Sequence, residues 1–88
     1  MGGCVIEFDE KKRKETLSQR GLDMARSIEI FRNAHTDQVD TRRPYGEKRI
    51  ITMGYLDSRA VVVVWTYRGN KRRIISMRKA NAREISRY

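Results

Sequence analysis

The residues best suited to chemistry are cations near the end of the chain. One short block contains Lys71, Arg72, Arg73, Arg78 and Lys79. If this block begins as a β-strand, side-chain alternation sends Arg72 and Arg73 to opposite faces, and Arg78 lies where the strand gives way to a helix. Guanidinium groups bind phosphates and stabilise the charge that develops at phosphorus. The block therefore predicts a phosphate site, although a solvated edge strand would show the same run.

The distribution of charge favours the phosphate site. The chain has 88 residues, with 20 Lys and Arg against 11 Asp and Glu, which gives a formal net charge of +9. Residues 1–47 hold 9 basic and 9 acidic side chains, whereas residues 48–88 hold 11 basic ones and only Asp57 and Glu84 as acids. A surface shaped only by solubility would mix its charges. The excess points to a polyanionic partner, which is nucleic acid, an anionic membrane or an acidic protein.

The chain has few residues that could bind a metal ion or act in histidine-based catalysis. The chain has one Cys and one His, and its acidic residues are scattered, so we expect no metal site and no cofactor. His35 lies in a loop-like segment, where a surface position is expected. Arg, Lys and Tyr remain abundant, and they bind phosphate and transfer protons when neighbouring cations lower their pKa values. Cleavage of RNA by its own 2′-hydroxyl needs no other groups.

The last segment offers further candidates near the same junction. Glu84 and Tyr88 could approach Arg78, but an ion pair would explain Glu84 equally well and packing would explain Tyr88. A basic helical stripe of Lys79, Arg83 and Arg87 would either bind RNA or face solvent.

The length of the chain predicts a single domain over residues 1–88. One Cys cannot close an intramolecular disulfide, which fits a reducing compartment, and we expect a cytoplasmic protein. The longest apolar run, Ala60 to Trp65, is too short to span a membrane, and no signal segment opens the chain. Met1-Gly2-Gly3-Cys4 hints at lipidation, but the myristoylation pattern needs Ser or Thr where Ile6 stands.

The opening of the chain predicts a strand followed by a charged helix. The strand contains Val5, Ile6 and Phe8. Asp9 is a suitable N-cap for a helix running to about Gln19, and Gly21 suits the left-handed residue that ends it. In this helix Leu17 is the only apolar anchor.

A second helix and a loop complete the first half. Asp23 can cap the helix, whose apolar face is expected to contain Met24, Ala25, Ile28 and Phe31. Residues 33–46 are polar and predict a loop, with a short edge strand near Val39.

Three strands are predicted in the second half, over about 48–55, 60–68 and 71–77. The run from Val61 to Trp65 is β-branched and apolar, which is typical of a central strand buried on both faces. Gly69-Asn70 predicts a two-residue hairpin between the last two strands.

A final helix over 79–88 should pack through Ala82, Ile85 and Tyr88. The resulting order, β-α-α-β-β-β-α, predicts an α+β fold with helices packed on a mostly antiparallel sheet.

The sequence resembles the BrnT family of toxins, which have a RelE-like ribonuclease fold. The strongest similarity is Arg73-Ile74-Ile75-Ser76-Met77-Arg78-Lys79-Ala80, followed by Arg83-Glu84 and Tyr88. Weaker similarity covers Asp9-Glu10-Lys11-Lys12, Leu17, Gly21, Glu47-Lys48-Arg49, Gly54 and Val62-Val63-Val64-Trp65-Thr66. The chain departs from the family at Phe8, Thr16, Gln19 and Arg20, where Trp, Asn, Lys and His are common, and at Ala25-Arg26, where two Glu are common.

The resemblance implies a metal-independent endoribonuclease that cleaves RNA and inhibits translation. It also implies a cognate antitoxin with a ribbon-helix-helix part, operator DNA bound only through that antitoxin, and a homodimer or a heterotetramer with it. Carried over by position, the catalytic candidates are Lys12, Arg49, Arg73, Arg78, Glu84 and Tyr88. Arg73 and Arg78 would hold phosphate, Lys12 or Glu84 would act as base and Tyr88 as acid. The RNA-binding candidates are Arg72, Lys79, Arg83 and Arg87.

Two other classes of function fit the same charge. A small basic nucleic-acid-binding module would neutralise phosphates without catalysis. A protein-interaction partner would use its cations on an acidic segment without contacting RNA.

Overall fold

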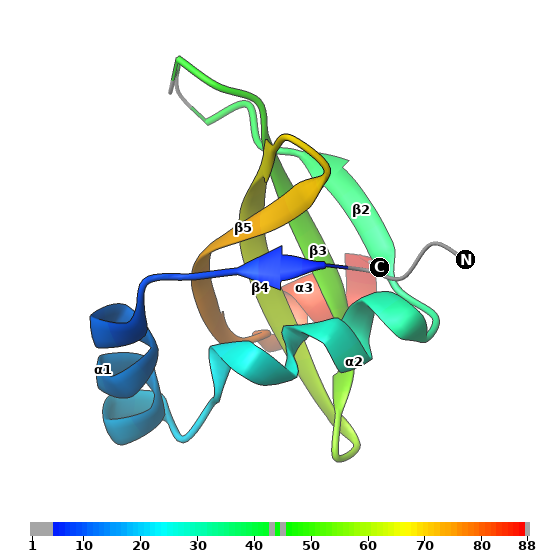
Figure 1. The fold of residues 1–88 in the computed structure, drawn as a ribbon. Coiled ribbons are helices and arrows are strands. Elements are labelled where there is room, and N and C mark those ends of the chain that lie inside the picture. The colour runs from blue at the N-terminus through cyan, green and yellow to red at the C-terminus, as the bar shows by residue number, and fades with distance from the viewer. Residues whose placement is uncertain (1–4, 43, 45, 88) are drawn as a thin grey trace.

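The computed structural model describes residues 5–42, 44 and 46–87 (Figure 1). Tyr88 and the Met1–Cys4 segment lie outside these residues. The elements are β1 (Ile6–Glu7), α1 (Glu10–Arg20), the 3₁₀ turn η1 (Met24–Arg26), α2 (Ser27–Arg32), β2 (Thr36–Val39), β3 (Arg49–Leu56), β4 (Arg59–Arg68), β5 (Lys71–Lys79) and α3 (Ala82–Arg87). The described chain is therefore α+β, and β2 is the short edge strand expected near Val39.

The sheet has the order β1-β5-β4-β3-β2, with β4 in the centre as predicted. The pairings of β2 with β3, β3 with β4 and β4 with β5 are antiparallel. β1 instead runs parallel to β5, with Ile6 opposite Arg72 and Glu7 opposite Arg73. The sheet is thus mixed, because the chain leaves β1 through α1 and α2 and reaches the opposite edge before it returns.

The core lies between one face of the sheet and the segment η1–α2. Val61, Val63 and Trp65 of β4 are buried against Met24 and Ile30, which are fully buried. Figure 1 shows α2 in front of the sheet and α3 behind it. We call the sheet side that faces α2 the core face and the other side the open face.

Strand β4 is buried on both faces, as its β-branched run predicts. The side chains of Val62 and Val64, which alternate with the core residues, are 0% and 6% exposed. On the core face the Trp65 indole donates to Thr52 Oγ1 at 2.7 Å, and Thr52 Oγ1 donates to Asp37 Oδ1 at 2.6 Å. This chain of hydrogen bonds links three neighbouring strands and runs from the buried Trp65 and Thr52 to Asp37, which is exposed.

Helix α1 has the predicted ends but not the predicted anchor. Asp9 accepts from the Lys11 backbone N–H, and Gly21 adopts the left-handed conformation with φ of 70°. Leu17 is 44% exposed, so its prediction as the anchor is wrong, and Thr16 is the buried residue instead. Because α1 carries so few apolar side chains, polar contacts attach it: Arg13 pairs with Asp23, and Arg20 donates to the Met77 carbonyl at 2.8 Å.

The second helical segment begins as the 3₁₀ turn capped by Asp23. A 3₁₀ turn aligns residues three apart, so Met24 and Ser27 face the core together, and Ile30 of α2 is buried beside them. Ala25 and Ile28 are only half-buried, which corrects their assignment to the core face. Phe31 is buried as predicted.

The last helix starts later than predicted. Lys79 still pairs with Val61 in the sheet, and α3 begins at Ala82 after Asn81, whose side chain accepts from the Glu84 N–H. The helical stripe of Lys79, Arg83 and Arg87 is therefore wrong, since Lys79 belongs to β5. The predicted packing is wrong too, because Ala82 and Ile85 are exposed.

No helix among the described residues is both long and apolar enough to cross a bilayer.

We predict that Thr52→Val destabilises the fold although the two side chains have similar size. The substitution leaves the buried Trp65 N–H without its acceptor, so the free energy of unfolding should fall by about 1–3 kcal/mol in urea titrations. Thr66→Val is the matched control. The Thr66 hydroxyl donates to the carbonyl of Lys48, which is an exposed residue, so water can replace the lost hydroxyl as the donor. Its loss should be less than about 1 kcal/mol. Equal losses for the two variants would contradict the role of the buried network.

Candidate functional site

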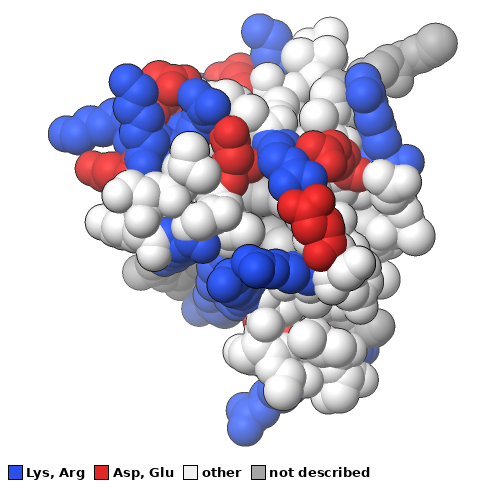
Figure 2. Space-filling view, turned by 90° about the horizontal axis from the view of Figure 1, so that it is seen from below, with Lys and Arg blue, Asp and Glu red and all other residues white. Residues whose placement is uncertain are grey.

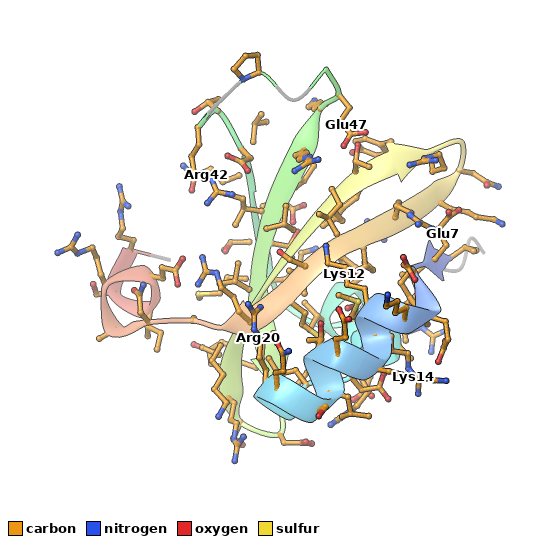
Figure 3. The ribbon with its side chains drawn as sticks, turned by 90° about the vertical axis from the view of Figure 1, so that its left-hand side faces the viewer. Glu7, Lys12, Lys14, Arg20, Arg42 and Glu47 are labelled. Atoms are coloured by element: carbon orange, nitrogen blue, oxygen red, sulfur yellow. The ribbon has the colours of Figure 1, made fainter. Side chains whose placement is uncertain are left out.

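The strand register places two candidate side chains, Arg49 and Arg73, in one row with Thr66 across the open face. Arg49 is opposite Thr66 in β4, and Thr66 is opposite Arg73 in β5. Because Trp65 points into the core, its neighbour Thr66 points to the open face, and the row points there with it. Lys12 reaches toward β5 from α1 (Figure 3). A hollow brings these side chains together, and its lining is Asp9, Lys12, Glu47, Arg49, Thr66, Arg68, Arg73, Ile74 and Ile75. We call it the Arg73 hollow.

Carboxylates hold both arginines of the Arg73 hollow. Arg73 Nη1 donates to Glu7 Oε2 at 3.0 Å, and Arg49 Nε donates to Glu47 Oε2 at 3.0 Å. Both pairs are partly exposed, with 29% of the Glu7 side chain and 36% of the Glu47 side chain accessible. An anion that enters the hollow can therefore compete with them for the guanidinium groups.

Glu7 was not among the predicted site residues. It reaches Arg73 because β1 and β5 pair in parallel across 66 positions of sequence, and no local pattern signals that pairing. Glu47 belongs to the family-like segment Glu47-Lys48-Arg49 but is not a predicted site residue either. Its position two residues before Arg49 is a signal that could have identified the pair.

A second hollow lies on the open face further along β5. Its lining is Gln38, Val39, Asp40, Thr41, Arg42, Ile51, Arg78, Glu84 and Arg87. We call it the Arg78 hollow. Arg78 donates to both carboxylate oxygens of Glu84, at 2.8 and 2.7 Å. Arg42 makes a similar two-point contact with Asp40, whose side chain is fully buried.

The Arg78 guanidinium lowers the pKa of Glu84 to about 2, with a smaller contribution from the Asn81 backbone N–H and opposed by burial. Glu84 is therefore ionised at neutral pH, and it retains little proton affinity. These properties favour a positioning role for Glu84 over the role of base. Asn81 and Glu84 also cap each other's backbone N–H groups, so the same carboxylate joins α3 to the end of β5.

The structure separates the sequence-predicted residues. Lys12, Arg49 and Arg73 meet in one hollow, and Arg78, Glu84 and Arg87 meet in the other. Tyr88 lies outside the described residues.

The other RNA-binding candidates lie elsewhere. Arg72 is on the core face, where its guanidinium carbon is 4.3 Å from the Phe31 ring centroid. Lys79 ends β5 beside Val61, and Arg83 is exposed on α3. Strand alternation predicted that Arg72 and Arg73 face opposite ways, and the structure confirms it.

Charges elsewhere on the surface are mixed. Figure 2 shows acidic side chains among the basic ones on the underside of the molecule. Arg26 pairs with both Glu29 and Asp57. Within residues 5–42, 44 and 46–87, no group of three His, Cys, Asp or Glu side chains is placed to hold a metal ion.

Comparison with known proteins gives the class to which this small basic chain belongs. Residues 8–84 match the family model described as ribonuclease toxin, BrnT, of type II toxin-antitoxin system. The class is thus that of the ribonuclease toxins of type II systems, which implies a cognate antitoxin as partner. Within that class the chain belongs to the BrnT family. No curated protein matches the chain significantly.

We predict that Glu84 titrates near pH 2 in the folded protein, against an ordinary carboxyl pKa above 4. Since the folded-state pKa is the lower one, the Arg78–Glu84 pair stabilises the protein above the ordinary pKa and loses its contribution as pH falls through about 2. NMR titration of the Glu84 carboxyl carbon measures this directly. In the Arg78→Ala variant the midpoint should return toward the ordinary range. A midpoint above 4 in the unmodified protein would show that the pair does not form in solution.

Proposed function

We propose that the protein is a metal-independent endoribonuclease that cleaves RNA in the cytoplasm and thereby inhibits translation. The observation that carries the proposal is the row of Arg49, Thr66 and Arg73, which Lys12 joins in one hollow. The RelE-like fold is part of the proposal, supported by the membership in the BrnT family and by the α+β element order.

The scissile phosphate binds between Arg49 and Arg73 in this account. Each guanidinium already holds one carboxylate, and a phosphate with its two non-bridging oxygens is a suitable competitor for the same donors. Binding therefore exchanges one anion for another, and the cations need not reorganise. Fixed donors around the phosphorus then stabilise the extra negative charge of the transition state.

Proton transfer uses the groups beside that phosphate. A carboxylate released from its arginine, Glu7 or Glu47, accepts the proton of the RNA 2′-hydroxyl, and the 2′-oxygen attacks phosphorus. The bond from phosphorus to the 5′-oxygen breaks, and Lys12 donates a proton to the departing oxygen. The products are a 2′,3′-cyclic phosphate and a 5′-hydroxyl. Side chains of this protein thus supply the charge stabilisation and both proton transfers. With Glu84 held by Arg78, Lys12 is the acid here and no longer a candidate base.

The Arg78 hollow binds a second phosphate of the same RNA. Arg42, Arg78 and Arg87 line it together with the acids Asp40 and Glu84, which leaves one net positive charge among these five side chains. Arg78 and Glu84 thus contribute by positioning the RNA, and Tyr88, which lies outside the described residues, stays a proposed proton donor. The exposed Arg83 and the strand-end Lys79 add general attraction for RNA.

The antitoxin of this system carries a ribbon-helix-helix part and covers the cationic open face. The net charge of +9 attracts an acidic partner, and covering the two hollows would block RNA directly. Through this antitoxin the complex, a heterotetramer or one built on a toxin homodimer, binds operator DNA. Co-expression with each adjacent gene identifies the antitoxin by relief of growth arrest.

We predict that the purified protein cuts single-stranded RNA in excess EDTA and that Arg73→Ala lowers the cleavage rate at saturating RNA by about a hundredfold or more. Arg59→Ala is the matched control, because Arg59 is an exposed arginine at the β3–β4 hairpin, away from both hollows. It should cut at the parental rate. Melting temperatures must agree before rates are compared.

Two outcomes would contradict the proposal. Activity that disappears with EDTA and returns with Mg²⁺ would require a metal mechanism. RNA binding without cleavage, affected equally by both substitutions, would favour the non-catalytic binding module.

A further inference from the structure

Aromatic side chains form a continuous row on the core face, ending near the tip of the β4–β5 hairpin. The Phe31 and Trp65 ring centroids are 5.6 Å apart, and those of Trp65 and Tyr67 are 5.0 Å apart, both edge to face. Phe31 and Trp65 are buried, whereas Tyr67 is 58% exposed. The row thus has a fixed inner end and an outer ring that solvent reaches.

The residues next to Tyr67 along the hairpin are cationic, and Arg72 is the one that shares its face of the sheet. Arg68 follows Tyr67, Lys71 follows the Gly69-Asn70 turn, and Arg72 is opposite Tyr67 in the register. The Arg72 guanidinium carbon lies 4.3 Å from the Phe31 ring centroid and 4.9 Å from that of Trp65. Residues 58–83 contain no Asp or Glu, so no acid of this segment offsets the hairpin.

We propose that Tyr67 stacks on a nucleobase of single-stranded RNA whose phosphates lie in the Arg73 hollow. The inference rests on the proposed ribonuclease function and adds a binding contact for the substrate. Exposed aromatic rings among cations are the usual platform for unpaired bases, because every base offers a π face and the flanking phosphates need positive charge. A purely apolar protein contact would gain nothing from Arg72 beside the ring or from the cations on the other face of the hairpin.

The Tyr67 ring and the Arg73 hollow lie on opposite faces of the same end of β4. Thr66 and Arg68 line the Arg73 hollow, and Tyr67 lies between them in the strand with its side chain on the opposite face. Residues 67–71 are all exposed. This hairpin projects from the sheet as the yellow-orange turn in Figure 1. RNA that leaves the hollow can therefore pass around the hairpin tip and place a neighbouring base on Tyr67.

A second exposed tyrosine provides a matched control. Tyr55 is 53% exposed, close to the value for Tyr67, but it lies on β3 beside Ala34, His35 and Met53. Neither of the two cationic hollows includes it. Removal of its ring should test the general effect of losing a surface tyrosine.

The experiment measures binding of a fluorescent 2′-O-methyl oligoribonucleotide, which cannot be cut, over a range of salt concentrations. Tyr67→Ala should raise Kd about 5- to 100-fold without changing the salt slope, because stacking neutralises no phosphate. Tyr67→Trp should restore binding, and Tyr55→Ala should change Kd less than about twofold. An oligonucleotide with abasic sites should bind the unmodified protein weakly and show no further loss with Tyr67→Ala.

Three results would overturn the inference: a Tyr67→Ala Kd within about twofold of the parent, an equal loss in Tyr55→Ala, or a loss of salt slope in Tyr67→Ala. A defect confined to antitoxin binding would also overturn it and would identify Tyr67 as a protein contact. If the protein binds the oligonucleotide through Tyr67 but cuts no RNA, the proposed function fails while the stacking contact stands.

Discussion

Burial of β4 on both faces is the constraint on which the rest of the structure depends. From Val61 to Thr66 the strand is almost inaccessible to solvent, so it must lie inside the sheet with a strand on each side. Trp65 points into the core and hydrogen-bonds Thr52, which fixes the register of β3 against β4. Once Trp65 points one way, Thr66 points the other, and Arg49 and Arg73 align with it on the open face.

Ion pairing explains how so basic a chain keeps its arginines close together. Arg49, Arg73 and Arg78 each hold a carboxylate, and these carboxylates come from different parts of the chain. Partly exposed pairs of this kind contribute little to stability, so the phosphate that we propose to bind there would exchange with a carboxylate at low cost. The Arg78–Glu84 pair differs, because both carboxylate oxygens are used and the pKa of Glu84 is strongly lowered. That pair joins α3 to the sheet, and for this reason we propose the Arg73 hollow as the place of the chemistry.

The sequence predicts those features that depend on local interactions. Asp9 and Gly21 mark the ends of α1, and Gly69-Asn70 marks the hairpin, because caps and turns are set by a few neighbouring residues. The anchor of α1 was missed, since contacts with distant Asp23 and Met77 replace apolar packing and leave Leu17 exposed.

The candidate site was predicted only in part. The cations were evident from charge and family resemblance, but their division into two hollows depends on strand register across the whole sheet. The parallel pairing that brings Glu7 to Arg73 is equally non-local. The prediction begins the last helix at Lys79 because Lys79, Arg83 and Arg87 lie four residues apart, whereas pairing with Val61 keeps Lys79 in β5.

The central claim is that the RNA supplies its own nucleophile while the Arg73 hollow supplies charge and proton transfer. The most direct measurement uses an oligoribonucleotide with one mapped cleavage site and a single 2′-deoxy substitution on the nucleotide 5′ to that bond. Without the 2′-hydroxyl, cleavage at that bond should stop while binding stays within a few-fold of the all-ribose oligonucleotide. Continued cleavage of the deoxy-substituted bond would contradict the account, because an external nucleophile would then be attacking the phosphorus.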